Sequence, residues 1–265
     1  FEPTAIQNVD ADGFASATDC GDASTPAHTT VGAAVIAANP GDTIRVCPGT
    51  YAPEANTIVL NKANLTLTGV GATKPVLQTS SLTTGTGSSN MFHVAANGIT
   101  LNNLEIQKTN TANQDIIWVQ GDNFTATNNL IYGPNPGGPW NVTGFVSRAF
   151  TMSPGADNVT VSGNVIHTLR QPAYLDAATG GTISNNQVSG TRGWVVVDGV
   201  YTFSGNTFGE PQNEACDIAL TTATVVANHS PLLSLSTNND NAYICSYAGG
   251  PVGRALAYVD ATPAV

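Results

Sequence analysis

Short apolar strands and polar turns alternate along most of the chain, and one unit of this pattern recurs. It reads Asn-Leu-Thr-Leu-Thr-Gly-Val at 64–70, Gly-Ile-Thr-Leu-Asn-Asn-Leu at 98–104 and Asn-Val-Thr-Val-Ser-Gly-Asn at 158–164. The central threonines of the copies, spaced 34, 25, 35, 22, 20 and 22 residues apart, are Thr66, Thr100, Thr125, Thr160, Thr182, Thr202 and Thr224. A repeat of this length without a helical period predicts a solenoid. We therefore expect an all-β fold, a right-handed parallel β-helix whose coils stack directly on one another.

An asparagine follows the central threonine by four residues in most copies. These asparagines are Asn129, Asn164, Asn186, Asn206 and Asn228, whereas Val70 and Leu104 take the same place in two earlier copies. In stacked coils, amide side chains at one bend can hydrogen-bond along the axis and satisfy buried polar groups. The spacing therefore predicts a structural ladder rather than an active site.

The open ends of a solenoid must be covered, and the sequence predicts a cover at the N-terminal end. Val31, Ala34, Val35 and Ala38 follow the i, i+3, i+4, i+7 spacing of a short amphipathic helix. We expect one domain overall, with an N-terminal extension at 1–28, the capping helix and first strand at 29–48, the coils at 49–229, and a C-terminal cap or assembly tail at 230–265.

The chain contains four cysteines, and their positions predict one disulfide near each end. Stacked coils lie about 4.8 Å apart, so Cys47, before the first repeat, and Cys216, after the sixth, would be roughly 25 Å or more apart. Disulfide-bonded Cα atoms lie within about 7 Å of each other. We therefore expect the pairs Cys20–Cys47 and Cys216–Cys245.

Charge argues against a nucleic-acid partner, and the length of the apolar runs argues against a membrane span. The formal net charge is −10 and only 10% of the residues are charged, so we expect no nucleic-acid partner. No apolar run approaches the ~20 residues that a helix needs to span a bilayer, and we expect no membrane span. The chain starts at Phe1 and has an even number of cysteines, which indicates an extracellular protein, secreted or at the cell surface, that has lost an export signal.

The run Val-Gly-Ala-Ala-Val-Ile-Ala-Ala-Asn-Pro-Gly-Asp-Thr-Ile-Arg-Val-Cys-Pro-Gly-Thr-Tyr at 31–51 resembles the N-terminal segment of pectate-lyase-like β-helix proteins. The later Asn-x-Thr-x-x-x-Asn coils resemble the same superfamily, so the resemblance covers roughly residues 29 to 230. It implies the fold. It does not select a function, because the superfamily includes lyases, hydrolases, epimerases, adhesins and structural proteins.

The acidic signatures that this resemblance implies for an enzyme are missing. The chain has no Asp-Pro-His and no Asp-Asp sequence. Asp176 and Asp198 each end a strand and could meet across adjacent coils, as glycoside hydrolysis by two carboxyl groups requires. The alternative is that both side chains make Asx turns.

Arginines give a second candidate for catalysis. Arg148, Arg170 and Arg192 are spaced 22 and 22 residues apart, so they should line one edge of consecutive coils, with His167 and Tyr174 nearby in sequence. A row of arginines could bind uronate carboxylates, with one Arg or His as the base that removes the C5 proton. The alternative is that these arginines are solvated side chains at exposed turns.

The N-terminal extension contains a candidate calcium loop. Asn8, Asp10, Asp12 and Asp19, with the backbone carbonyl of Phe14, reproduce ligand positions 1, 3, 5, 12 and 7 of a calcium-binding loop. Flanking helices are not evident, and Asp/Gly turns are the alternative. No other cofactor is expected.

Four Asn-x-Thr sequences are candidate glycosylation sites. They begin at Asn64, Asn123, Asn141 and Asn158. Three of them arise from the repeat itself, whereas Asn141 lies in an insertion and is the best candidate.

The missing catalytic signature favours an extracellular structural or adhesive protein that is not an enzyme. Its partner would be a second copy, because the apolar runs after Ser230 could pack on a neighbour and build a filament or surface layer. The alternative is a lyase or epimerase that acts on uronic-acid polysaccharides. A non-catalytic glycan-binding module is the third interpretation, and it requires exposed aromatic side chains, with Trp194 and Tyr174 as the candidates.

Overall fold

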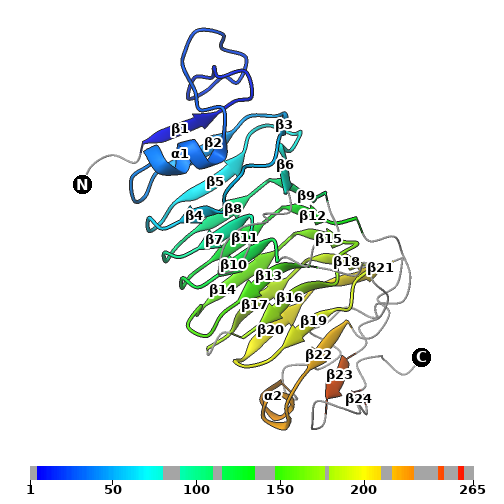
Figure 1. The fold of residues 1–265 in the computed structure, drawn as a ribbon. Helices are drawn as coiled ribbons and strands as arrows, with labels where there is room; N and C mark the ends of the chain where they lie inside the picture. Colours follow the sequence, from blue (N-terminus) through cyan, green and yellow to red (C-terminus); the bar gives the residue numbers. More distant parts are fainter. Residues whose placement is uncertain are drawn as a thin grey trace.

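The computed structural model describes residues 5–79, 90–109, 115–134, 147–176, 179–209, 217–229, 244–247 and 256–259. The described residues form an elongated solenoid in which three sheets run along one axis (Figure 1). From β2 (Thr43–Val46) to β19 (Trp194–Val196), each strand pairs with the strand three places further along the chain, so that each of these coils contributes one strand to each sheet. Three parallel sheets wound in this way form the parallel β-helix predicted from the repeat.

The strands are short, and neighbouring strands are parallel in all three sheets except for one pair at the end of the third sheet. In spatial order, the first sheet contains β1 (Ile6–Val9), β2 (Thr43–Val46), β5 (Thr66–Gly69), β8 (Thr100–Asn102), β11 (Thr125–Thr127), β14 (Val159–Ser162), β17 (Gly181–Ser184) and β20 (Tyr201–Ser204). The second contains β3 (Thr50–Tyr51), β6 (Val76–Thr79), β9 (Glu105–Lys108), β12 (Leu130–Tyr132), β15 (Val165–His167), β18 (Gln187–Ser189) and β21 (Thr207–Gly209). The third contains β4 (Ile58–Leu60), β7 (Phe92–Val94), β10 (Ile117–Val119), β13 (Arg148–Met152), β16 (Gln171–Leu175), β19 (Trp194–Val196), β22 (Ile218–Leu220), β23 (Ile244–Tyr247) and β24 (Leu256–Val259), and only β23 and β24 pair antiparallel.

The repeat sets the register of the first sheet. The central threonines pair directly from coil to coil, from Thr66 with Thr100 to Thr182 with Thr202. Because side chains alternate across a strand, the residue after each threonine points into the solenoid. These inward residues are at most 1% exposed and are Leu67, Leu101, Ala126, Val161, Ile183 and Phe203. The core is therefore a stack of like positions.

The asparagine ladder lies at the bend between the first and second sheets. Asn164 is fully buried, and its Oδ1 accepts hydrogen bonds from the backbone N–H of Asn129 at 2.9 Å and from the side-chain amide of Asn129 at 3.0 Å. The same two bonds join Asn164 to Asn186 and Asn186 to Asn206. Each link thus satisfies a backbone donor that the bend would otherwise leave buried without a partner.

Asn228 is not part of this ladder, which corrects the expectation from the sequence. The segment around Thr224 forms the helix α2 (Ala223–His229), and Asn228 is exposed on it. Val225 and His229 are the buried residues of α2. The short helix α2, which packs on the last coils, therefore stands where a seventh strand and bend were expected.

The N-terminal cover is present as the helix α1 (Val31–Ala37). Thr30 caps it by accepting a hydrogen bond from the N–H of Ala33 at 3.2 Å, and Val31, Ala34 and Val35 are buried. The helix lies across the first coil, next to β1, β2 and β4 (Figure 1).

One disulfide joins the N-terminal extension to the first coil. Cys20 and Cys47 are bonded, with their Cα atoms 5.6 Å apart. The second expected pair, Cys216–Cys245, lies outside the residues whose side chains the structure describes. A disulfide fits an extracellular protein. Neither described helix has the length and apolar character needed to cross a bilayer.

Candidate functional site

The outer face of the third sheet carries a column of polar and aromatic side chains. Strand pairing places His93, Trp118, Thr151 and Tyr174 in one column, each opposite the next on successive coils. All four are partly exposed, whereas the residues on either side of each are buried. The column follows from the buried–exposed–buried alternation of each third strand.

The first two members of the column form a stacked pair. The rings of His93 and Trp118 lie with centroids 4.4 Å apart and planes 17° apart. A nitrogen of His93 lies 2.6 Å from Oε1 of Gln120, and the indole N–H of Trp118 donates to Oγ of Ser153 at 2.6 Å. These bonds fix both rings on the surface of the sheet.

An ion pair lies beside the centre of the column. Nη1 of Arg148 is 3.0 Å from Oδ2 of Asp115, and the side chains are 25% and 21% exposed. The same carboxylate oxygen accepts from Oγ1 of Thr151 at 2.6 Å, and Nε of Arg148 donates to Oε1 of Gln171 at 2.7 Å. The guanidinium is therefore held in place while part of it faces solvent.

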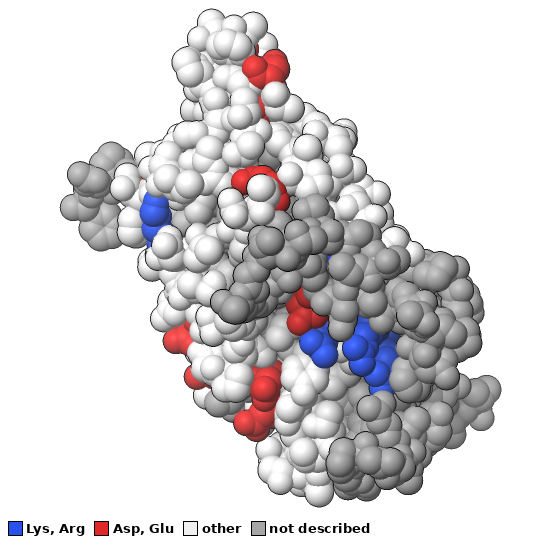
Figure 2. Space-filling model, in the orientation of Figure 1, with Lys and Arg blue, Asp and Glu red and all other residues white. Residues whose placement is uncertain are grey.

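Arg148 also reaches the next coil. Its Cζ lies 4.7 Å from the centroid of the Tyr174 ring, within the range of a cation–π contact. The two side chains thus form a pair on the outer face, with a permanent positive charge beside a phenol. Figure 2 shows Lys and Arg side chains gathered in one area of the visible face, next to Asp and Glu side chains.

The three arginines of the predicted row lie on successive coils, but the strand register pairs Arg148 with Gln171 and not with Arg170. The N–H of Arg170 donates to the carbonyl of Ser147 at 3.0 Å, and the N–H of Arg192 donates to the carbonyl of Arg170 at 2.8 Å. The backbones of Arg170 and Arg192 are therefore hydrogen-bonded from coil to coil, whereas Arg148 is offset from them by one position. Arg192 is only 7% exposed, so the accessible arginines of the row are Arg148 and Arg170.

Asp176 and Asp198 lie on adjacent coils. Each follows the third strand of its coil, and the register pairs Leu175 with Val196. Burial raises the pKa of Asp176, and the negative charge of Asp198 raises it further. Asp198 accepts a hydrogen bond from the N–H of Gly199 at 2.8 Å, whereas an Asx turn uses the N–H two residues further on, so the Asx interpretation stays a prediction. Asp176 comes two residues after Tyr174 and is partly exposed, as Tyr174 is.

The structure does not bring His167 to this face. His167 ends β15 in the second sheet, where its ring stacks on Tyr132 with centroids 5.2 Å apart. Tyr132 in turn donates to Oε1 of Glu105 at 2.8 Å. His167 and Tyr174 are close in sequence, but a bend between two sheets separates them, which corrects the grouping expected from the sequence.

Lys108 is a further cation near the ion pair. Burial lowers its pKa to about 8, and the charge of Asp115 opposes the shift. Lys108 is only 2% exposed, so a polymer on the outer face cannot touch its amine.

The aromatic candidates divide between the core and the surface. Phe92, Phe150 and Trp194 are fully buried, so Trp194 cannot contact a glycan. Tyr174 is partly exposed, as is Trp118, so two aromatic side chains remain on the outer face.

The candidate calcium ligands are engaged elsewhere. Oδ1 of Asn8 accepts a hydrogen bond from Arg45 at 3.1 Å, and the guanidinium of Arg45 also donates to the carbonyl of Ser16 at 3.0 Å. Oδ1 of Asp12 accepts from the N–H of Phe14, and Oδ1 of Asp19 from the N–H of Gly21.

Asp10, Asp12 and Asp19 do not form a cluster of three carboxylates. Within the described ranges, the group with metal-ligand spacing is Asp10 with Cys20 and Cys47, and both cysteines are in the disulfide. Calcium binding stays a prediction, which titration of the protein with calcium can test.

The candidate glycosylation sites of the repeat share one corner. Asn64, Asn123 and Asn158 are exposed, with φ angles of 61°, 55° and 56°. Each stands just before a strand of the first sheet, in the bend that follows a strand of the third sheet. Asn141 lies outside the described residues.

Sequence reasoning did not find His93, Asp115 or Thr151. The signal was present: Phe92-His93-Val94, Ile117-Trp118-Val119 and Phe150-Thr151-Met152 share an apolar–outward–apolar pattern. Insertions of different length before each of these strands hide the correspondence.

Comparisons with known proteins give two distant structural resemblances. No protein-family model matches the chain, and no curated protein matches it. The crystal structure of pectate lyase Pel9A is 15% identical, covering 83% of this chain and 69% of that chain with a TM-score of 0.45. A rhamnogalacturonan lyase is 11% identical, covering 82% of this chain and 81% of that chain with a TM-score of 0.37. The fold assignment rests on the strand pairing of this chain, and its chemistry must be argued from its own residues.

Proposed function

We propose that this protein binds a linear uronic-acid polysaccharide along the outer face of the third sheet and cleaves it as a lyase, by β-elimination. The observation that carries the proposal is the pair of Arg148 and Tyr174, held on the exposed column by Asp115 and Gln171.

The column suits a linear polymer that runs along the solenoid axis. Successive strands are about 4.8 Å apart, which is similar to the length of one sugar unit in a chain. Each coil offers a different side chain to such a polymer, from the stacked His93 and Trp118 to Thr151 and Tyr174. Contacts over several units support recognition of a chain rather than of a single sugar.

Three side chains supply the chemistry of β-elimination. Arg148 binds the uronate carboxylate, which neutralises its charge and makes the C5 proton more acidic. Tyr174, in its phenolate form beside that cation, takes the proton from C5 and becomes the neutral phenol. Asp176, whose pKa is raised by burial and by Asp198, protonates the departing O4 oxygen. The C5–H and C4–O bonds break, a C4=C5 double bond forms, and the new chain end carries a hydroxyl group.

A second candidate reaction is glycoside hydrolysis by Asp176 and Asp198. The specific observation is that the charge of Asp198 contributes to the raised pKa of Asp176, so one carboxyl group could act as acid and the other as base or nucleophile. Hydrolysis gives the Arg148–Tyr174 pair no role, so we consider hydrolysis less well supported than β-elimination.

One assay separates the two reactions. The protein is incubated with polygalacturonate or alginate while ultraviolet absorbance and reducing ends are both followed. A lyase produces reducing ends together with absorbance from unsaturated products, and a hydrolase produces reducing ends alone. If neither signal appears and no binding is measured by affinity electrophoresis, the proposed function is wrong.

The filament or surface-layer interpretation stays a prediction. Most of the tail after Ser230 lies outside the described residues, and the described part adds β23 and β24 to the third sheet. Light scattering over a range of protein concentrations tests it, because an assembling protein gains mass as its concentration rises.

A further inference from the structure

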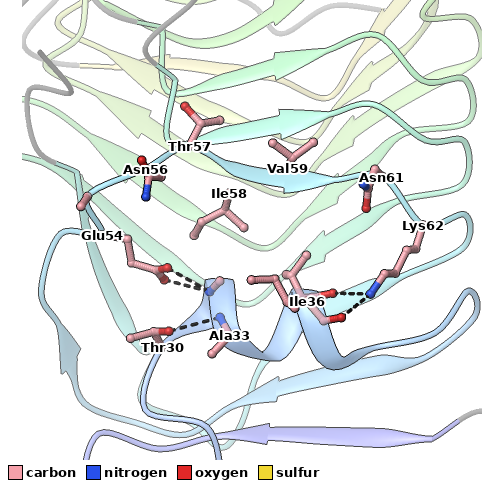
Figure 3. A pocket seen from close by; sticks show the side chains of 13 residues that line it. Thr30, Ala33, Ile36, Glu54, Asn56, Thr57, Ile58, Val59, Asn61 and Lys62 are labelled. Carbon is pink, nitrogen blue, oxygen red and sulfur yellow. Dashed lines mark hydrogen bonds between the residues drawn. The ribbon is translucent and has the colours of Figure 1, made fainter. Parts of the chain in front are cut away.

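A pocket of about 630 Å³ lies between α1 and β4, at the N-terminal end of the third sheet (Figure 3). Its size falls in the range of about 300–1,000 Å³ that small-molecule sites occupy. Ile36 from the helix and Val59 from the strand face it, with Glu54 at one end of the helix and Lys62 at the other (Figure 3).

Both charged side chains of the pocket are already used by the helix. The carboxylate of Glu54 accepts two hydrogen bonds from the N–H of Gly32, at 2.9 and 3.1 Å. Nζ of Lys62 donates to the carbonyls of Val35 at 2.9 Å and Ile36 at 2.6 Å, and to that of Ala38. Each charge lies at the helix end that it stabilises. The pocket therefore offers an incoming molecule no uncompensated charge.

The remaining lining is aliphatic and amide. Ile36 is 81% exposed and Val59 is 40% exposed, which makes them two of the exposed large hydrophobic residues of the described chain. The amides of Asn56 and Asn61 are exposed and make no side-chain hydrogen bond to other described residues. A neutral sugar ring fits this lining, because its C–H groups can cover Ile36 and Val59 while its hydroxyl groups bond to the amides.

The pocket is continuous with the column of the third sheet. Val59 pairs with His93, so it is the next position of the column toward the N-terminus. In Figure 3 the further strands of the sheet follow β4 on the side away from α1. A polymer that lies along the column therefore reaches Val59 and meets the helix there.

We infer that this pocket is the terminal subsite of the polysaccharide track and that it takes a neutral sugar at the end of a uronic-acid chain. The inference rests on the proposed function, since it needs a chain on the third sheet. It adds a sugar preference that the column alone does not predict. The charged uronate units lie near Arg148, and the sugar unit next to α1 is uncharged.

Calorimetry with oligouronides of one length tests the subsite. The ligands are the uncapped oligomer and the same oligomer with one neutral hexose at either end. One capped form should bind about tenfold more tightly than the uncapped oligomer, which corresponds to ~1.4 kcal/mol. Val59→Asp should remove this gain, because it replaces the apolar surface that covers the C–H groups of the ring with a hydrated carboxylate. Val200→Asp is the matched control, because Val200 is 41% exposed and lies near the opposite end of the solenoid.

The outcomes separate the subsite from the proposed function. Equal affinity for capped and uncapped oligomers, or a gain that survives Val59→Asp, overturns the subsite while the track still binds. Absence of binding by every oligouronide, with Tyr174→Phe indistinguishable from the wild type, overturns both.

Discussion

Arg148 and Tyr174 stand on neighbouring coils with the guanidinium carbon 4.7 Å from the ring centroid, although 26 positions separate them along the chain. The contact exists because β13 and β16 pair in register, which places Thr151 beside Tyr174 on the outer face. Asp115, from the preceding coil, then orients the arginine. Three coils thus build one site, and each proposed role can be tested separately.

The role of Arg148 predicts a large loss of activity when its charge is removed. Arg148→Ala should lower kcat/KM on polygalacturonate by about 100-fold or more, the usual effect of removing a group that stabilises developing charge. Arg148→Lys should recover only part of this, because an amine cannot bond to Asp115 and Gln171 as a guanidinium does. Arg45→Ala is the control, since Arg45 contacts Asn8 and Ser16 in the N-terminal extension. Equal losses in Arg148→Ala and Arg45→Ala would argue against a role at the site.

The acid role of Asp176 predicts the shape of the pH profile. Its protonated form donates the proton, so activity should fall as pH rises through the pKa of Asp176, which lies above the usual value of 3.8. Asp198→Asn removes one of the two causes that raise this pKa. The falling limb should therefore move to lower pH, but only in part, because burial is the larger cause. If the falling limb of the pH profile is the same in Asp198→Asn and the wild type, a group other than Asp176 is the acid.

The asparagine ladder predicts a stability difference between two superficially equivalent residues. Asn164→Ala should lower the free energy of unfolding by about 1–3 kcal/mol, because it leaves the backbone N–H of Asn129 buried without an acceptor. Asn228→Ala, at the same offset from its threonine, should change it by less than about 0.5 kcal/mol, because Asn228 is exposed on α2. Urea unfolding followed by circular dichroism measures both. Similar losses for the two variants would contradict the observed ladder.

The difference between Asn164 and Asn228 also shows where prediction from sequence succeeds and fails. Register along the first sheet was predictable, because each copy carries its own alternation of inward apolar and outward polar residues. The copy at Thr224 keeps the Thr-to-Asn spacing but ends in a short apolar segment that fits a strand or a helix equally well. Packing against the last coils favours the helix. A short-range sequence pattern does not show which residues will pack against this segment.

The site was harder to predict than the fold. His167 and Tyr174 are seven positions apart, yet a bend places them on different sheets. His93 and Trp118 are 25 positions apart, yet their rings are in contact. Which residues meet depends on the number of residues in each bend and insertion, and these numbers vary from coil to coil. A strict repeat length would have made the column visible in the sequence.

His229 predicts a loss of stability in mild acid. It is fully buried; its Nδ1 lies 2.7 Å from the carbonyl of Val225, and its Nε2 accepts from the N–H of Tyr201 at 2.9 Å. Burial lowers its pKa below the usual 6.5. The unfolded chain therefore binds a proton at a pH where the folded chain does not, and stability should decrease as pH falls below about 6.5. Protonation would also remove the acceptor that holds Tyr201.

His229→Gln isolates this effect, because glutamine keeps a donor and an acceptor and does not titrate. The melting temperature of the wild type should fall between about pH 7 and pH 5, and that of the variant should fall less, since each unit of pKa shift is worth about 1.4 kcal/mol. His167, whose pKa burial also lowers, acts in the same direction and should leave a residual slope. His167→Gln in the His229→Gln background should remove more of it. If the melting temperatures of the wild type and His229→Gln change equally with pH, His229 does not cause the pH dependence of stability.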